Sequence, residues 1–411
     1  MTYGNDDFVP IILGTNINAY TMARSLHEAF GVRSLALGRF PLRETAHSAI
    51  LDVRAYRDFD QPDVIVDTLV ALADELPGRT RLLIPNIEFY ATVLLEHRER
   101  LAEHYVIPLV DAALAARVMD KADFARTCAE LGVPHPATVV VAPEDRGDPA
   151  LGADLPFGYP AILKPADTDT YPRIQFEGKQ KVYLVADAAE LRSVVGRIDR
   201  AGYRGDLIVQ EYLDGDETVM RVANAYCDSS GRMRALSVGQ VVLAERDPRW
   251  AGNYNAVLSV EDAPLAGAIR RLLDGLGFVG AANFDVMVAR DGTSRILELN
   301  LRLGACHGYA LAAGVNLTRC YVDDLVYGRQ LPDVVTVDER LWVNMPYPVV
   351  LAHTPRALRG RVRAAARRGV AHALRYRADR GLRRLLDVTR IDLRHTLDYL
   401  RHPALRLSPG R

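Results

Sequence analysis

The stretch that decides the fold runs from Asn283 to Asn300 and reads NFDVMVARDGTSRILELN. Two apolar-rich runs flank Asp291 and Gly292, a dipeptide that is typical of the two-residue turn of a β-hairpin. A turn of that length makes Arg290 face Thr293, and every residue further out then has a defined partner. The sequence therefore predicts two paired antiparallel strands in this part of the chain.

Polar side chains gather on one face of this predicted hairpin. Counting outward from the turn places Asp285 directly opposite Glu298, and Asn300 shares the face of Glu298 because side chains alternate along a strand. Like charges at such a position destabilise a strand pair, and a bound cation removes the repulsion. Two carboxylates and an amide oxygen suit Mg²⁺, so we expect a magnesium site here. The alternative is a solvated polar face.

The chain of 411 residues contains 47 arginines but only four lysines. All four lysines lie within 61 consecutive residues, and Lys164 ends an apolar strand predicted at residues 161–165. Lysine supplies a compact charge on a flexible stem, where arginine supplies a rigid fork. Their concentration favours a phosphate-binding site, and the alternative is solvated lysines at strand edges. The four residues are Lys121, Lys164, Lys179 and Lys181.

A third feature is the segment from Leu207 to Glu217, where an apolar strand runs into an acidic turn. Such a strand can offer backbone N–H and C=O groups to the edge of an adenine, and Glu217 can reach ribose hydroxyls. By itself the pattern is that of an ordinary strand followed by an acidic loop. A functional interpretation therefore depends on the other two features.

The N-terminal part of the chain alternates strands with a helix. Ile17–Phe30 reads as a helix that ends at Gly31, a residue suited to the left-handed position after the last turn. This alternation predicts a parallel α/β domain over residues 1–115. Ligands of such sheets bind beyond the carboxyl ends of the strands. The predicted strands are residues 9–13, 32–37 and 81–84, and the substrate candidates at the first strand end are Thr15, Asn16 and Asn18.

The middle of the chain reads as α+β with mostly antiparallel strands. Helices are expected at residues 119–132 and 187–201, and a Gly/Pro/Asp-rich loop at 145–160. Strands are expected at residues 137–141, 161–165, 181–185, 207–213, 217–226, 233–244, 283–289 and 295–300.

In order along the chain, the features are lysines, an acidic hinge, an aspartate and the motif Glu298-x-Asn300-x-Arg302. This order resembles the ATP-grasp superfamily of carboxylate–amine ligases over roughly residues 119–320. The resemblance implies a parallel α/β (pre-ATP-grasp) domain followed by a two-lobed ATP-grasp domain at residues 116–330. Its lobes would span about 116–206 and 207–330, and a C-terminal segment with basic helices would follow at 331–411.

The resemblance also implies roles for the matched residues. Lys164 and Arg302 would be catalytic, Arg302 by holding an acyl phosphate with its guanidinium fork; the alternative for Arg302 is a structural salt bridge. Two Mg²⁺ ions would be held by Asp285, Glu298 and Asn300. Residues expected around ATP are Lys121, Lys164, Lys179 and Lys181 for the phosphates, Gln210, Glu211, Tyr212 and Leu213 for adenine, and Glu217 for ribose.

The whole chain, including Phe8–Gly14, Tyr20–Ser25 and Phe176–Tyr183, is similar to the branch that contains D-aspartate ligases of peptidoglycan synthesis. This implies amide formation through an acyl phosphate, adding D-aspartate or a similar amino acid to a peptidoglycan precursor. The alternatives are a ligase that makes a small peptide or natural product, and a non-catalytic nucleotide sensor or scaffold. One departure is the phosphate loop, which has Gly178 as its only glycine and carries Asp167, Asp169, Tyr171 and Arg173.

Composition excludes several classes of protein. Apolar residues make up 49% and charged residues 25%, as in ordinary globular proteins. No run of 18 apolar residues exists, and the N-terminus lacks the charged and apolar regions of a signal peptide. We expect a cytoplasmic protein in which the four cysteines are unpaired thiols. These cysteines are Cys128, Cys227, Cys306 and Cys320.

Charge is distributed unevenly. Residues 351–411 carry a net charge of +12 and the first 350 residues a net charge of −13. Within the basic segment, leucines recur near the helical period of 3.6, which predicts a basic amphipathic helix. Such a helix can lie on the inner face of an anionic membrane or pack on the acidic body with its arginines solvated or paired. Nucleic acid is not expected, because no aromatic side chains interleave with the charge. The leucines are Leu382, Leu386, Leu393, Leu397 and Leu400.

Overall fold

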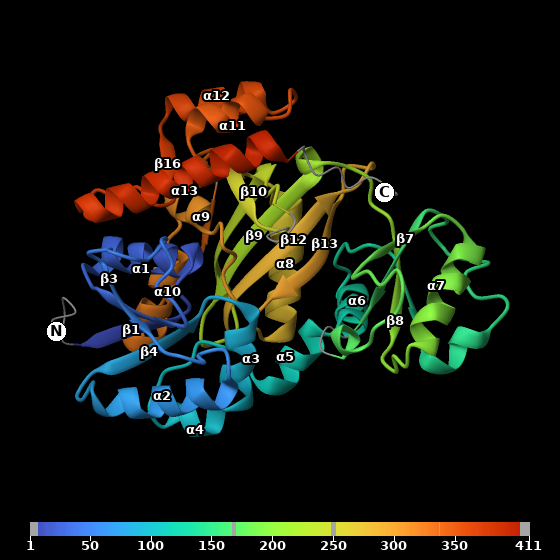
Figure 1. The fold of residues 1–411 in the computed structure, drawn as a ribbon, viewed down its shortest axis with the longest axis horizontal. Helices are drawn as coiled ribbons and strands as arrows, with labels where there is room; N and C mark the ends of the chain where they lie inside the picture. The colour runs from blue at the N-terminus through green and yellow to red at the C-terminus, as the bar shows by residue number, and fades with distance from the viewer. Residues whose placement is uncertain (1–6, 167–169, 248–251, 337, 403–411) are drawn as a thin grey trace. The chain divides into compact units, whose positions relative to one another are not determined.

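The computed structural model describes residues 7–166, 170–247, 252–336 and 338–402 (Figure 1). These residues form two compact units. The first unit holds residues 7–112, 217–285 and 300–402, and the second holds 113–216 and 286–299. The predicted domain boundaries near residues 115, 206 and 330 stay predictions.

The N-terminal part of the first unit is a parallel sheet, as the alternation of strands and helices predicted. Its strand order is β3-β2-β1-β4. Helix α1 (Ile17–Phe30) begins at Asn16, whose side chain accepts the N–H groups of residues 18 and 19, and ends at Gly31 with φ 68°. The other elements are β1 (Phe8–Leu13), β2 (Ser34–Gly38), β3 (Leu51–Ala55), α2 (Pro62–Asp74), β4 (Thr80–Pro85), α3 (Glu88–Glu96) and α4 (Arg98–Ala102).

A mixed sheet follows, with the order β13-β12-β9-β10-β11-β15-β16 and β14 paired to β10. Long antiparallel pairs dominate it, such as β9 with β10 and β10 with β11. Its strands are β9 (Met220–Cys227), β10 (Met233–Ala244), β11 (Tyr254–Val260), β12 (Gly280–Val288), β13 (Ser294–Asn300), β14 (Val334–Val335), β15 (Leu341–Val343) and β16 (Val370–His372). Helices of this region are α8 (Ala263–Leu276), α9 (Gly308–Ala312) and α10 (Leu317–Tyr321).

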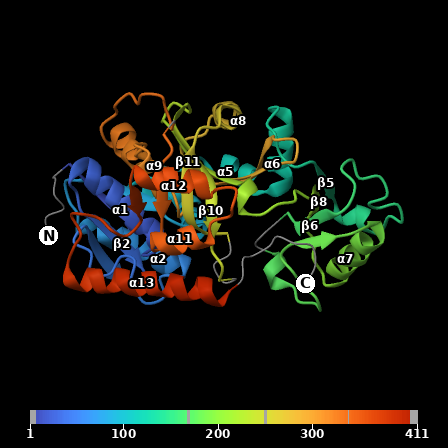
Figure 2. The same ribbon diagram turned by 90° about the horizontal axis from the view of Figure 1, so that it is seen from above.

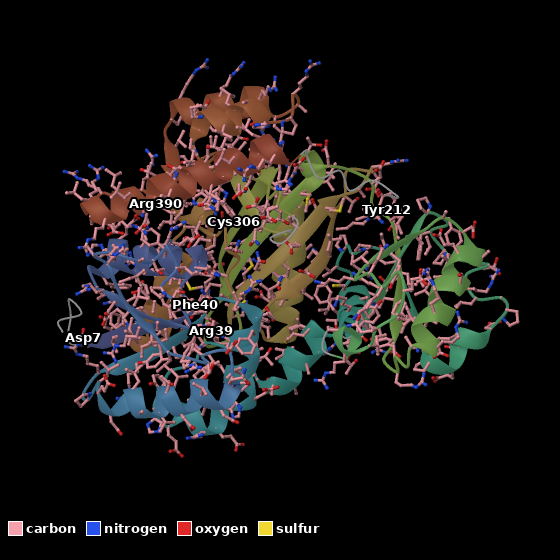
Figure 3. The ribbon with its side chains drawn as sticks, in the orientation of Figure 1. Asp7, Arg39, Phe40, Tyr212, Cys306 and Arg390 are labelled. Carbon is pink, nitrogen blue, oxygen red and sulfur yellow. The ribbon has the colours of Figure 1, made fainter. Side chains whose placement is uncertain are left out.

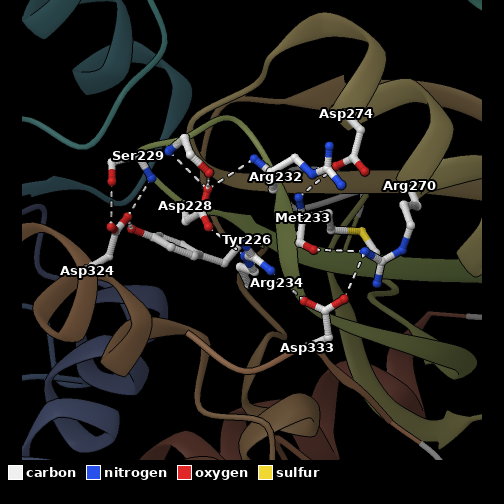
Figure 4. Close-up of polar contacts among 11 residues, drawn as sticks. Tyr226, Asp228, Ser229, Arg232, Met233, Arg234, Arg270, Asp274, Asp324 and Asp333 are labelled. Atoms are coloured by element: carbon white, nitrogen blue, oxygen red, sulfur yellow. Dashed lines mark hydrogen bonds and ion pairs between the residues drawn. The ribbon is translucent and has the colours of Figure 1, made fainter. Parts of the chain in front are cut away.

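Buried carboxylates anchor the turn between β9 and β10 (Figure 4). Asp324 accepts hydrogen bonds from Tyr226 Oη and from the N–H and hydroxyl of Ser229, each at 2.8 Å. Arg234 bridges Asp228 at 2.5 Å and Asp333 at 3.0 Å. Because the buried carboxylates Asp228 and Asp324 are paired or hydrogen-bonded, their burial is tolerated, and the network is structural; Asp333 is exposed.

The second unit is built on an antiparallel sheet of order β5-β8-β6-β7. Its core packs helix α7 on this sheet through Leu163, Val195 and Leu207, which are fully buried. The tyrosine Tyr171 of the predicted phosphate loop joins this core, whereas Asp167 and Asp169 lie outside the described residues. The elements are α5 (Ala112–Met119), α6 (Lys121–Glu130), β5 (Thr138–Val141), β6 (Ala161–Pro165), β7 (Tyr183–Val185), α7 (Ala188–Arg200) and β8 (Leu207–Glu211).

The turn of the β12–β13 hairpin differs from the prediction. Thr293 accepts the N–H of Ala289 at 2.9 Å, and Ala289 in turn accepts the N–H of Gly292 at 2.9 Å. The loop therefore has three residues, with Gly292 at φ 82°, a common hairpin in which glycine takes the left-handed position. Arg290 does not face Thr293, so the predicted two-residue turn was wrong. The predicted placement of Asp285 opposite Glu298 stays a prediction.

The C-terminal segment is part of the first unit. Strand β16 pairs with β15, and Leu374 is 1% exposed. The predicted basic helix is present as α13, and Figures 1 and 2 show it in red beside the first unit's helices. The helices here are α11 (Tyr347–His353), α12 (Arg359–Arg367) and α13 (Leu382–Arg401). The predicted combination of a parallel α/β part, an α+β part and a C-terminal helix is thus confirmed.

One simpler prediction, that of unpaired thiols, also matches the structure. All four cysteines are free thiols, and three of them are buried. Among the described helices, none combines the length and the apolar character needed to cross a membrane.

Candidate functional site

The lysines of the second unit form an electrostatic cluster around the end of β6. Lys164 Nζ donates to Gln210 Oε1 at 3.0 Å. Burial lowers the pKa of Lys164 to about 8, and the positive charges of Lys121 and Lys181 lower it further, whereas Glu298 opposes the shift. Three of the four lysines and one predicted metal ligand therefore interact at one place. Such a surplus of positive charge suits a polyanionic ligand.

Lys121 and Lys179 differ from each other in their surroundings. Lys121 is the first residue of α6, which Asp120 caps, and its Nζ donates to the carbonyl of Ala166 at 3.4 Å. Lys179 donates to the carbonyls of Pro172 at 2.9 Å and Ile174 at 2.6 Å. Lys179 thus binds carbonyl groups of its own loop, whereas Lys121 belongs to the cluster around Lys164.

The predicted adenine segment lies at the end of β8, a central strand. Gln210 donates from Nε2 to Thr138 at 3.0 Å, besides accepting from Lys164. Glu211 pairs its carboxylate with Arg295 and accepts the N–H of Ala137. The side chains of Gln210 and Glu211 are thus already engaged. Beyond the strand, Tyr212 Oη donates to Asp214 at 3.4 Å and Leu213 follows outside any regular element, while Glu217, in the first unit, is buried.

The predicted magnesium ligands have the chemistry that this ion prefers. Asp285 is half-buried and accepts from Tyr254 Oη at 3.0 Å. Asn300 is half-buried and contacts Asn283 at 3.5 Å, whereas Glu298 is exposed. No group of three or more His, Cys, Asp or Glu side chains among the described residues is arranged to hold a metal. Two carboxylates and one amide nevertheless fit Mg²⁺, which keeps several positions for water and phosphate.

The segment after β13 carries Arg302 and is tightly held. Arg302 Nε lies 3.8 Å from Glu88 Oε2, and its Nη1 donates to the carbonyl of Leu303 at 3.2 Å. Gly304 donates its N–H to Asn224 at 2.7 Å. A Cβ at Gly304 would lie 2.6 Å from Asn283 Nδ2, so glycine is required by close approach. This fixes the backbone next to Arg302.

An asparagine network ties this segment to the parallel sheet. Asn18 Nδ2 donates to the carbonyls of Asn86 at 2.7 Å and Leu303 at 2.9 Å. Asn86 Nδ2 donates to Asn16 Oδ1 at 2.8 Å. Of the three substrate candidates, Asn16 caps α1 and Asn18 holds the Arg302 segment. Thr15 donates to the carbonyl of Phe40 at 2.6 Å.

Several residues of this network were not predicted from the sequence. Asn86 and Glu88 follow the carboxyl end of β4, so the strand-end rule that selected Asn16 and Asn18 would also have found them. Tyr254 and Asn283 carried no such signal. The unpredicted residues are Asn86, Glu88, Asn224, Tyr254 and Asn283.

His307, which sequence reasoning left out of the site, is a buried neutral imidazole. Burial lowers its pKa to about 4, and Nδ1 lies 2.9 Å from the carbonyl of Gly304. A histidine that stays neutral at pH 7 supports the backbone here. None of the predicted site residues lines the cavity of about 480 Å³ beside α13, whose lining includes Pro41, Thr45, Val53 and Asp387.

Known proteins were compared with the chain. It is 32% identical over 358 residues to the D-aspartate ligase of Enterococcus faecium (strain Aus0004), covering 85% of each chain. The structure matches the ADP complex of N5-carboxyaminoimidazole ribonucleotide synthetase with a TM-score of 0.59, 13% identity and 86% coverage of each chain. It also matches the biotin carboxylase domain of Hydrogenobacter thermophilus 2-oxoglutarate carboxylase, crystallised with MgADP, ADP and bicarbonate. There the TM-score is 0.58 at 16% identity, covering 80% of this chain and 71% of that one. No protein-family model matches.

Proposed function

This chain belongs to the D-aspartate ligase family of the ATP-grasp carboxylate–amine ligases, enzymes that form C–N bonds, and we propose that it couples D-aspartate or a similar amino acid to a peptidoglycan precursor. The observation that carries the ligase assignment to this chain's own residues is the cluster of Lys164 with Lys121, Lys181 and Glu298. A polyphosphate would relieve the repulsion among the three ammonium groups. A nucleoside triphosphate is therefore the ligand that this cluster fits best.

In the proposed site the residues of β6 and β8 bind and orient ATP. Lys164 and Lys121 neutralise phosphate oxygens, and Lys181 adds charge from the other end of the loop. Gln210 holds Lys164 in place through its hydrogen bond. Backbone groups of Glu211, Tyr212 and Leu213 would face adenine, Glu217 ribose, and Lys179 would keep the loop closed through its two carbonyl contacts.

Asp285, Glu298 and Asn300 are the residues that would hold Mg²⁺, and we propose two ions. When bound, the metal would neutralise charge on the phosphate oxygens during transfer. The oxygen-only donor set of these three residues supports the assignment. Tyr254 would orient the Asp285 carboxylate through its hydrogen bond.

The proposed reaction has two steps. The carboxylate of the amino acid attacks the γ-phosphorus of ATP, so that the bond to the β-phosphate oxygen breaks and ADP leaves. The amine then attacks the acyl phosphate, releases inorganic phosphate and forms the amide, losing a proton. Phosphoryl transfer depends mainly on positioning and charge neutralisation. Arg302, backed by Glu88 and by the Asn18 contact to Leu303, would bind the acyl phosphate.

The substrate and the location of the enzyme are proposals of their own. Similarity to a named D-aspartate ligase supports an amino-acid donor of that kind, and a cell-wall precursor would place the enzyme in the cytoplasm. A ligase that makes a small peptide or natural product remains the second candidate. A sensor or scaffold is disfavoured, because the predicted metal ligands Asp285, Glu298 and Asn300 are all present in the sequence.

The test is ADP release with purified protein, Mg²⁺ and ATP across D- and L-amino acids, with and without a peptidoglycan precursor as amine acceptor. We expect release with D-aspartate that depends on the acceptor. Absence of ADP release with every carboxylate would contradict the ligase proposal. Release with another donor would retain the ligase and replace the substrate.

Glu298→Gln tests the metal ligands. Loss of one carboxylate charge should lower kcat at least a hundredfold, while the thermal unfolding midpoint stays unchanged because Glu298 is exposed. Glu103→Gln, another exposed position, serves as the matched control and should keep full activity. Retained activity in the Glu298 variant would overturn the metal assignment.

A further inference from the structure

Helix α13 exposes its leucines instead of burying them. Its five most exposed leucines have 57–83% of their surface accessible, although leucine is usually a core residue. Four of the five fall on one stripe, at steps of four, seven and seven residues along the helix, and such steps return to the same face. The five are Leu382, Leu385, Leu386, Leu393 and Leu400.

The opposite face of α13 is held inward by charged and polar contacts. Arg384 is 1% exposed, forms an ion pair with Asp379 at 3.2 Å and lies over the ring of Tyr20. Asp392 is bound by His372 at 3.0 Å and Arg375 at 2.6 Å. Turning the helix to bury the leucines would break these ion pairs. The outward direction of the leucines is therefore a consequence of how the inner face is anchored.

The charged side chains of α13 are also divided between its inner and outer faces. Asp387 and Asp392 are buried on the inner face. The arginines of the helix other than Arg384 are exposed, and in Figure 3 many side chains around α12 and α13 point away from the ribbon. The outer face thus combines leucines with cations and presents no fully exposed carboxylate. Its arginines are Arg383, Arg390, Arg394 and Arg401.

We propose that this leucine–arginine face of α13 docks on an anionic lipid bilayer, with the helix lying in the plane of the interface. From Leu382 to Leu400 the stripe is about 27 Å long at 1.5 Å per residue. Its leucines would enter the boundary between headgroups and acyl chains while the arginines bind lipid phosphates. Charge complementarity selects this occupant.

A protein partner fits this face less well. Protein interfaces concentrate their binding energy in buried aromatic anchors, and the exposed residues of α13 include no Trp, Tyr or Phe. A narrow, straight stripe with cations along it matches a planar surface. The proposal goes beyond the catalytic function and does not depend on it.

The test is flotation of the full chain with vesicles of phosphatidylcholine, with and without phosphatidylglycerol. We expect binding to the anionic vesicles only, reduced at high salt because exposed charges are screened. The double variant Leu386→Gln/Leu393→Gln should weaken binding at least tenfold while its unfolding midpoint and ADP release stay unchanged. Leu42→Gln, which changes an exposed leucine outside α13, is the matched control and should bind like the parent.

Two outcomes would overturn the proposal. One is equal binding of the parent chain and the double variant to anionic vesicles. The other is a stable dimer in solution that the double variant dissociates, since the face would then be an interface between copies. Light scattering of the lipid-free protein measures this directly. Because flotation needs no turnover, its result is independent of whether the ligase proposal holds.

Discussion

At Lys164, burial and two neighbouring ammonium groups hold the pKa at about 8, well below the usual value for lysine. Bound phosphate favours the charged form, so nucleotide binding should take up a proton above pH 8. We expect the affinity for ADP to be constant below pH 7.5 and to fall by up to tenfold per pH unit above pH 8. Calorimetry in two buffers with different ionisation heats measures both the affinity and the proton uptake.

Lys164→Arg is the control for this pH dependence. A guanidinium stays charged throughout this range, so any binding that the variant retains should lack the step near pH 8. An affinity of the parent chain that does not change between pH 7 and pH 9 would contradict the role of Lys164 as a phosphate ligand.

A substitution at Gly304 tests whether close packing of the backbone beside Arg302 is required. Gly304→Ala would bring a Cβ to 2.6 Å from Asn283 Nδ2, and overpacking of this kind costs about 1–3 kcal/mol. We expect a lower unfolding midpoint and reduced turnover, since the Arg302 segment must shift. Gly360→Ala, in α12 with no atom within 4 Å of the added Cβ, should be neutral or slightly stabilising. Equal effects of the two substitutions would contradict this role.

A buried ion pair, more than the leucines, holds helix α13 against the rest of the first unit. Arg384 pairs with Asp379 and donates to the carbonyls of Arg43 at 3.0 Å and Glu44 at 2.9 Å. Arg384→Ala leaves the Asp379 charge buried without its cation, which typically costs about 3–5 kcal/mol. Denaturant unfolding should show this loss, while the exposed neighbour change Arg383→Ala should cost less than about 0.5 kcal/mol. A similar loss in both variants would contradict the anchoring role.

The C-terminal segment is integral to the first unit of the molecule. Strand β16 extends the mixed sheet, and Val388, Ile391 and Tyr399 of α13 are buried against the body. Deletion of residues 355–411 should therefore unfold the first unit, instead of only removing a basic tail. Thermal unfolding and limited proteolysis measure this. A truncated chain with the parent's midpoint would show that the segment is dispensable.

For the whole molecule, hydrophobic periodicity was enough to predict the order of helices and strands along the chain. The concentration of lysines is visible in the sequence itself. Alternation between strands and helices, the helix end at Gly31 and the leucine spacing of α13 are local signals, and each is confirmed. The roles of the individual site residues stay predictions. Local signals suffice for elements because propensity and hydrophobic period act over a few neighbouring residues.

Long-range contacts determined the features that local signals could not predict. The hairpin turn at Arg290–Gly292 has three residues where two were expected, and the asparagine network between Asn18, Asn86 and Leu303 joins positions up to 285 residues apart. The sequence predicted an amphipathic α13, yet only the packing of Arg384 on Asp379 and Tyr20 determines that its leucines face outward. A hydrophobic period identifies a helix, but which face becomes buried depends on the partners that folding brings to it.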